Sequence, residues 1–237
     1  MSRLDEQLEN PATKFLEWDS DNKCFKYYKK FPEKKEDGTK GENILVPLPF
    51  TFLVLDILTT VKGYNDDEQS GYYSNEVKNI STDILKVRTK KGTAATGTWE
   101  EIKGILRDAK FCASVYVAIK GDKGELEIAN LQLKGAAVSS WFDFAKDNKK
   151  QIYKMAITVN DSIHKTKGKT EYNEPVFNLT PISPKTDNEA LELAKVLKVY
   201  HDAYFSNTEE VPVDETPEIP EPTKGEQSDS LDRKSVV

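Results

Sequence analysis

The chain has 237 residues, of which 34 are Lys or Arg, 40 are Asp or Glu and only 37% are hydrophobic. This length accommodates one large domain or two small ones, and the high charge content is typical of a soluble protein. No apolar stretch is long enough to span a bilayer, and the N-terminus lacks the apolar core of a secretory signal, so we expect a cytoplasmic protein.

The negative charge is concentrated at the C-terminal end. Residues 207–237 contain nine acidic and three basic residues, so they carry the whole net charge of −6, and residues 1–206 are neutral. With four prolines and no aromatic residue, this segment cannot bury enough surface to offset the entropy cost of ordering. We therefore predict a folded domain over residues 1–206 and a disordered, acidic, Pro-rich tail over residues 207–237. The tail either only solubilises the protein or binds a partner, through Glu209, Glu210, Asp214, Glu215, Glu218 and Glu221.

The first part of the domain is predicted to be strands. Aromatic-rich runs on both sides of a turn-forming cluster at residues 19–22 are typical of a β-hairpin. Residues 52–63 are rich in β-branched and aromatic side chains and predict either a strand pair or one long bent strand. The predicted strands cover residues 15–18, 24–28, 43–49, 52–63, 72–75 and 84–90.

Helices and strands alternate in the remainder. Thr98 with Glu101, and Thr186 with Glu189, have the spacing of a helix capping box. We expect the first helix to continue on one apolar face to Ala109, and the second to be the C-terminal helix. Between them we expect strands over 112–119, 126–133 and 152–159, a helix over 135–145, a basic loop over 164–169 and an extended segment over 172–182.

These elements predict the fold class. Eight or so short strands, two or three inserted helices and a C-terminal helix indicate a β-rich α+β protein. Our first expectation is an OB-like, partly closed β-barrel, and the alternative is a two-sheet sandwich.

Motifs for catalysis and metal binding are scarce. Cys24, Cys112, His164 and His201 are the only cysteines and histidines, and none lies within four positions of another. We therefore expect no metal and no cofactor. The chain has neither a Walker loop nor a nucleophile elbow. Scattered carboxylates leave a metal-dependent, nuclease-type enzyme as one alternative.

Basic and aromatic residues interleave along several stretches, most clearly in Phe25-Lys26-Tyr27-Tyr28-Lys29-Lys30-Phe31. A groove for single-stranded nucleic acid needs cations for the phosphates and flat rings for unstacked bases. Lysine greatly outnumbers arginine, which favours contact with the sugar-phosphate backbone over reading of base edges.

This pattern predicts two sets of binding residues. We expect base stacking from some of the tyrosines Tyr27, Tyr28, Tyr64, Tyr72, Tyr73 and Tyr153. We expect phosphate neutralisation from Lys29, Lys30, Lys86, Arg88, Lys90, Lys91, Lys154, Lys165, Lys167 and Lys169.

Several segments between residues 10 and 206 carry a family resemblance. They are Pro47-Leu48-Pro49-Phe50-Thr51-Phe52-Leu53-Val54-Leu55-Asp56, Val61-Lys62-Gly63-Tyr64, Gly71-Tyr72-Tyr73-Ser74-Asn75-Glu76-Val77, and Leu131-Gln132-Leu133-Lys134-Gly135-Ala136-Ala137 with Trp141. They resemble single-stranded DNA-binding proteins of tailed phages, including the crAss-like group.

The resemblance implies an OB-fold protein that coats intermediates of DNA replication, recombination or repair in a bacterial host cell. It also implies that the acidic tail docks replication or recombination proteins and competes for the DNA groove. Two features depart from the family: the zinc ligands of one phage branch have no counterpart, and the chain ends in Arg233-Lys234-Ser235-Val236-Val237 instead of an acidic-aromatic tip.

We therefore predict a non-enzymatic, sequence-independent single-stranded DNA-binding protein. Besides the nuclease, the alternative is a non-catalytic structural or virion-associated protein whose barrel packs only against other proteins.

Overall fold

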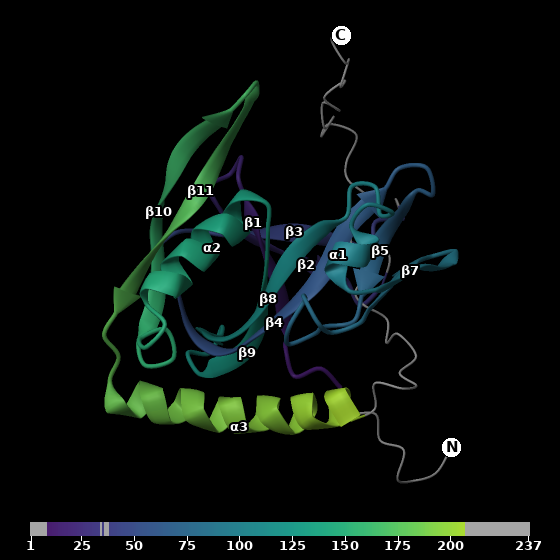
Figure 1. Cartoon of the computed structure of the whole chain (residues 1–237). Helices are drawn as coiled ribbons and strands as arrows, with labels where there is room; N and C mark the ends of the chain where they lie inside the picture. Colours follow the sequence, from purple (N-terminus) through teal and green to yellow (C-terminus); the bar gives the residue numbers. More distant parts are fainter. Residues whose placement is uncertain (1–8, 34, 36–37, 207–237) are drawn as a thin grey trace.

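The computed structural model describes residues 9–33, 35 and 38–206, so the acidic residues of the predicted tail, from Glu209 to Glu221, lie outside the described residues. The described part is β-rich with three helices, one of them C-terminal, as predicted (Figure 1). The strands are β1 (Lys14–Asp19), β2 (Cys24–Lys30), β3 (Gly41–Val46), β4 (Phe50–Asn65), β5 (Ser70–Ser74), β6 (Leu85–Thr89), β7 (Gly92–Gly97), β8 (Lys110–Lys120), β9 (Leu126–Lys134), β10 (Ala156–Lys167) and β11 (Thr170–Thr180). The helices are α1 (Trp99–Ile102), α2 (Ala136–Asp147) and α3 (Pro184–Ser206).

The strands form one mixed sheet with the order β3-β2-β1-β9-β8-β4-β5-β6-β7, and β10 joins β4 and carries β11. The β1–β9 pair is parallel, and the other strand pairs are antiparallel. The sheet is curved but does not close (Figure 1). The β-rich fold with a C-terminal helix is therefore confirmed, and its strands form a large mixed sheet that is not a closed barrel.

The long strand β4 divides this sheet into two parts. One edge of β4 pairs with β8, whereas the other edge pairs with β10 near Phe50 and with β5 near Asn65. A bulge between Val54 and Asp56 bends the strand, as bulges do. The prediction of a strand over residues 52–63 is confirmed in its long bent form.

The larger part of the sheet folds around α2. Trp141 on α2 is fully buried, and its ring lies 6.3 Å from that of Phe52 and 5.4 Å from that of Phe177. Trp18 Nε1 donates a hydrogen bond to the carbonyl oxygen of Asn173 at 2.8 Å, and the Asn173 N–H donates to Ser20 Oγ at 2.7 Å. Side-chain contacts therefore join β1 and the turn after it to β11. No ladder of backbone hydrogen bonds between strands is described there.

The smaller part of the sheet consists of β5, β6 and β7 with α1. The Glu101 carboxylate accepts hydrogen bonds from the backbone and hydroxyl of Thr98, as the predicted capping pattern requires. The helix nevertheless ends at Ile102, not Ala109, and it is followed by turns up to Asp108, which has a positive φ of 63°. The strand β7 was not predicted.

Two other predictions need correction. The predicted basic loop over residues 164–169 is the end of the β10–β11 hairpin, with Gly168 at a φ of 64° in the turn. The C-terminal helix begins at Pro184, and Ser183 Oγ accepts the hydrogen bond from the Thr186 N–H, so the predicted capping box at Thr186 and Glu189 is wrong.

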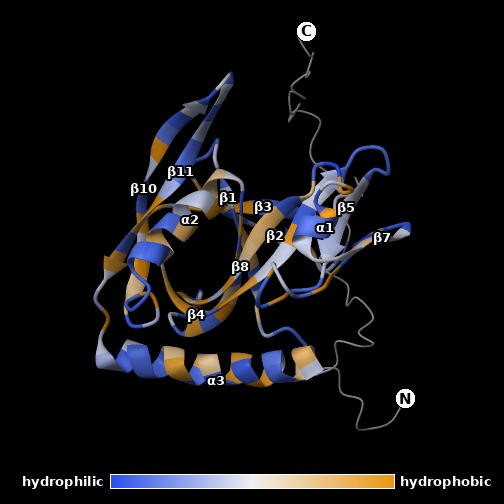
Figure 2. Cartoon of the chain, in the orientation of Figure 1, coloured by the Kyte–Doolittle hydropathy of each residue, from blue (hydrophilic) through white to orange (hydrophobic). Residues whose placement is uncertain are grey.

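The helix α3 lies on the sheet face opposite α2 (Figure 1). Leu197 and Ala190 are buried against this face. Apolar and polar residues alternate along α3 (Figure 2). Within the described residues, no helix combines the length and the apolar character that a membrane span requires.

Replacing Trp141 by Ala should lower the free energy of unfolding by about 3–5 kcal/mol, because it removes the largest side chain of the main core. Chemical denaturation would measure the loss. Replacing its neighbour Phe142, which is 41% exposed, by Leu should change stability by no more than about 0.5 kcal/mol. Equal losses for the two variants would contradict the proposed position of α2.

Candidate nucleic-acid interface

The structure places the predicted binding residues in four separate regions and does not gather them into one groove. In the sheet order, four strands separate β2 from β5. The end of β2 carries Tyr27, Tyr28, Lys29 and Lys30. The smaller part of the sheet and its turns carry Tyr64, Tyr72, Tyr73, Lys86, Arg88, Lys90 and Lys91. The hairpin end carries Lys165, Lys167 and Lys169, and the turn between α2 and β10 carries Tyr153 and Lys154.

The predicted tyrosines differ in their exposure. Tyr72 is only 3% exposed and belongs to the core of the smaller part, so it is not available for stacking on a base. Tyr27 packs against the main core, and the Tyr28 ring lies against Gly41. Of the six tyrosines, Tyr153 alone is more than half exposed, at 53%. It lies in a turn, whereas the sequence predicted a strand from residue 152.

Lys165 and Lys90 are among the predicted cations that are already engaged within the protein. Lys165 Nζ forms an ion pair with Glu174 at 2.6 Å, and this hydrogen-bonded carboxylate raises the pKa of Lys165. Lys90 Nζ donates a hydrogen bond to the carbonyl oxygen of Gln69 at 2.7 Å. Contact with a phosphate would have to replace these interactions, so both residues are weaker candidates than lysines without an acidic partner.

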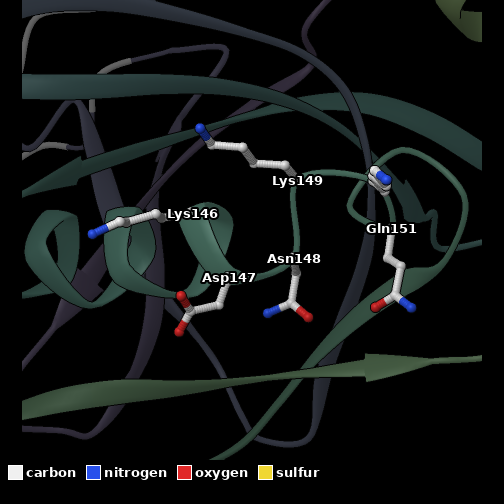
Figure 3. Close-up of a pocket in the computed structure, with 6 residues that line it drawn as sticks. Lys146, Asp147, Asn148, Lys149 and Gln151 are labelled. Carbon is white, nitrogen blue, oxygen red and sulfur yellow. The ribbon is translucent and has the colours of Figure 1, made fainter.

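Four lysines surround the α2–β10 turn. Lys146, Lys149, Lys150 and Lys154 are exposed, and none forms an ion pair with an acid among the described residues. Residues 146–151 line an open hollow in which Lys149 points to one side and Asp147 to the other (Figure 3).

The sequence prediction included Lys154 but missed Lys146, Lys149 and Lys150. The signal was nevertheless present, because residues 146–154 contain four lysines around a tyrosine, with Asp147 as the acid. This is the same basic-aromatic interleaving that identified the β2 stretch. We call Lys146, Lys149, Lys150, Tyr153 and Lys154 the lysine turn.

A different polar cluster lies beneath α3, and its Asp56 carboxylate acts electrostatically on Tyr153 of the lysine turn. The carboxylate of Glu76 accepts hydrogen bonds from the buried hydroxyls of Ser114 and of Tyr116 (2.8 Å for Tyr116). The Glu76 N–H donates to the Tyr204 hydroxyl at 2.8 Å, and His201 Nδ1 lies 2.8 Å from Asp56 Oδ2. These bonds attach α3 to the sheet, so we assign the cluster a structural role.

The environments of the two carboxylates shift their pKa values in opposite directions. Burial raises the pKa of Glu76, although hydrogen bonds from Ser114 and Tyr116 act against this shift. Burial also acts to raise the pKa of Asp56, but hydrogen bonds from His201 and the Ile57 N–H outweigh it, so the pKa is lowered. Across the described ranges, no three His, Cys, Asp or Glu side chains are grouped in a way that could hold a metal ion.

Comparison with known proteins gives no match to a family model, to a curated protein or to a solved structure.

Replacing Glu76 by Gln should remove a pH-dependent loss of stability. Because the folded state holds the Glu76 proton more tightly than the unfolded state, the native protein loses stability as pH rises above the ordinary value of 4.5 and through the raised pKa. The free energy of unfolding of the Gln variant should therefore improve relative to the native protein as pH rises, measured by urea denaturation at several pH values. A difference that stays constant with pH would contradict the raised pKa.

Proposed function

We propose that the protein binds single-stranded DNA through its sugar-phosphate backbone, with the lysine turn as the main contact. The observation that carries this proposal is the group of four unpaired lysines around the half-exposed Tyr153. Lysines neutralise phosphates as mobile point charges, and an exposed ring stacks on an unpaired base. Such contacts do not depend on sequence.

The OB-like identity of the curved sheet is part of the same proposal. The strands β3-β2-β1-β9-β8-β4-β10-β11 form a continuous hydrogen-bonded path. The turn after β1 approaches β11 at the other end of this path through Ser20 and Asn173. This arrangement supports a relationship to a barrel that stays open between β1 and β11.

The biological setting that we propose follows the phage resemblance. The protein would act in DNA replication, recombination or repair in the cytoplasm of a bacterial host. Its acidic C-terminal segment would contact replication or recombination proteins.

Replacing Lys149, Lys150 and Lys154 together by Gln should weaken binding to oligo-dT. For single strands, each lost phosphate contact lowers the slope of log affinity against log salt by about 0.7, so three contacts should lower it by about 2. Fluorescence anisotropy at several salt concentrations would measure both quantities.

The control is a triple Gln variant on α3, at Lys185, Lys195 and Lys198. Each of these lysines pairs with an acid on the same helix, on the face opposite α2. The control removes the same charge and should affect binding much less. Equal losses for the two triple variants would show that only the total charge matters.

Deleting residues 207–237 should strengthen binding to single strands, most clearly at low salt. This segment has a net charge of −6, and a tethered polyanion competes with DNA at an effective concentration of up to about a millimolar. Screening should reduce the gain, since the Debye length is about 10 Å at 0.1 M salt. Affinities of the full and shortened chains at two salt concentrations test this, and unchanged binding after deletion would support a purely solubilising segment.

A further inference from the structure

An exposed aromatic pair lies on the same helix as the start of the lysine turn. Phe142 on α2 is 41% exposed, and it is the one phenylalanine among the exposed large apolar residues of the described chain. Its ring packs on the half-buried Phe111 at the start of β8, with centroids 5.5 Å apart and planes inclined by 41°. Phe111 therefore supports one side of the Phe142 ring and leaves part of it open.

Helical spacing places this ring beside a cation. Phe142 and Lys146 are four residues apart, so they are neighbours on one outer stripe of α2. Trp141, on the inner side of α2, is buried in the main core, and Val138, one turn before Phe142, marks the boundary between the buried and the exposed sides. The lysine turn therefore continues along α2 toward an aromatic surface.

The acids of α2 lie on the adjoining stripe toward β11. Ser140 Oγ donates a hydrogen bond to Glu174 of β11 at 3.1 Å, which fixes the side of α2 that faces the hairpin. Asp143 belongs to this side, and its charge acts on Lys165 of β10. Lys146 has both Asp143 and Phe142 as helical neighbours, at spacings of three and four residues, and Asp143 also acts on Lys165 of the hairpin.

We infer that Phe142, supported by Phe111, is a base-stacking platform that extends the lysine turn along α2 and makes it selective for unpaired bases. This inference rests on the proposed binding of single-stranded DNA. Charge complementarity favours this occupant, because a polyanion that contacts Lys146 and Lys149 places its bases within reach of an apolar ring. A duplex keeps its bases stacked inside and gains nothing from the platform.

The test compares two ligands and two proteins. The ligands are oligo-dT and an abasic oligonucleotide of the same length, and the proteins are the native chain and Phe142→Leu. Loss of one stacked base should weaken oligo-dT binding by about 5- to 150-fold, which corresponds to about 1–3 kcal/mol. The same substitution should leave the affinity for the abasic strand unchanged.

Two further variants control for shape and for position. Phe142→Tyr keeps an aromatic face and should bind oligo-dT like the native chain. Phe205→Leu alters a ring on α3, on the opposite side of the sheet, and should also bind normally. If Phe142→Tyr loses as much affinity as Phe142→Leu, the ring does not stack on a base and the inference fails.

The outcomes separate this inference from the proposed function. If Phe142→Leu binds oligo-dT as tightly as the native chain does, Phe142 is not a stacking platform and this inference fails. Salt-dependent binding by the native chain would still support the lysine turn. Absence of oligo-dT binding by the native chain overturns both, and an apolar partner protein then becomes the occupant to examine. A loss confined to oligo-dT, with abasic binding preserved, supports both.

Discussion

The structure depends on the bulge in β4. Phe50, Phe52 and Val54 point into the main core around α2, and strict alternation would direct residues 56 and 58 to the same side. The bulge between Val54 and Asp56 reverses the alternation, so Leu58 faces α3 and Asp56 reaches His201. Without this extra residue, a carboxylate would enter an apolar core, and α3 would lose the hydrogen-bond partner of His201 that attaches it to the sheet.

Local patterns in the sequence were sufficient for elements that are formed by neighbouring residues. The hairpin β1–β2, the long strand β4 and the helix α2 each have a hydrophobic period or a turn signal of their own. The strand β7 has none, because Gly92–Gly97 contains only glycine, alanine and threonine and is held by its pairing with β6. The open sheet depends on the parallel pairing of β1 with β9, whose residues are more than 100 positions apart, as in Leu16 with Leu131.

The candidate site could be predicted in composition but not in placement. Tyr72 and Tyr73 are adjacent on β5, and the alternation of a strand sends them to opposite faces, so one becomes core while the other stays half-buried. The sequence alone does not determine which of the two tyrosines is buried. The sequence pattern predicts Lys165 as a binding residue, but the pairing of β10 with β11 brings Glu174 into an ion pair with it. Lys146 lies one residue beyond the predicted helix over 135–145, and only the observed extent of α2 to Asp147 places it one turn from Phe142.

The neutral charge of residues 1–206 is compatible with binding of a polyanion because acids and bases are paired unevenly. On the sheet, Lys14, Lys26 and Lys134 each form an ion pair with an acid, and the lysines of α3 do so along the helix. Partnered charges largely cancel at the distance of an approaching strand. The lysines around the α2–β10 turn lack such partners among the described residues, so their potential extends into solvent. The position of lysines without an ion-pair partner, more than the total number of bases, therefore determines which surface attracts a polyanion.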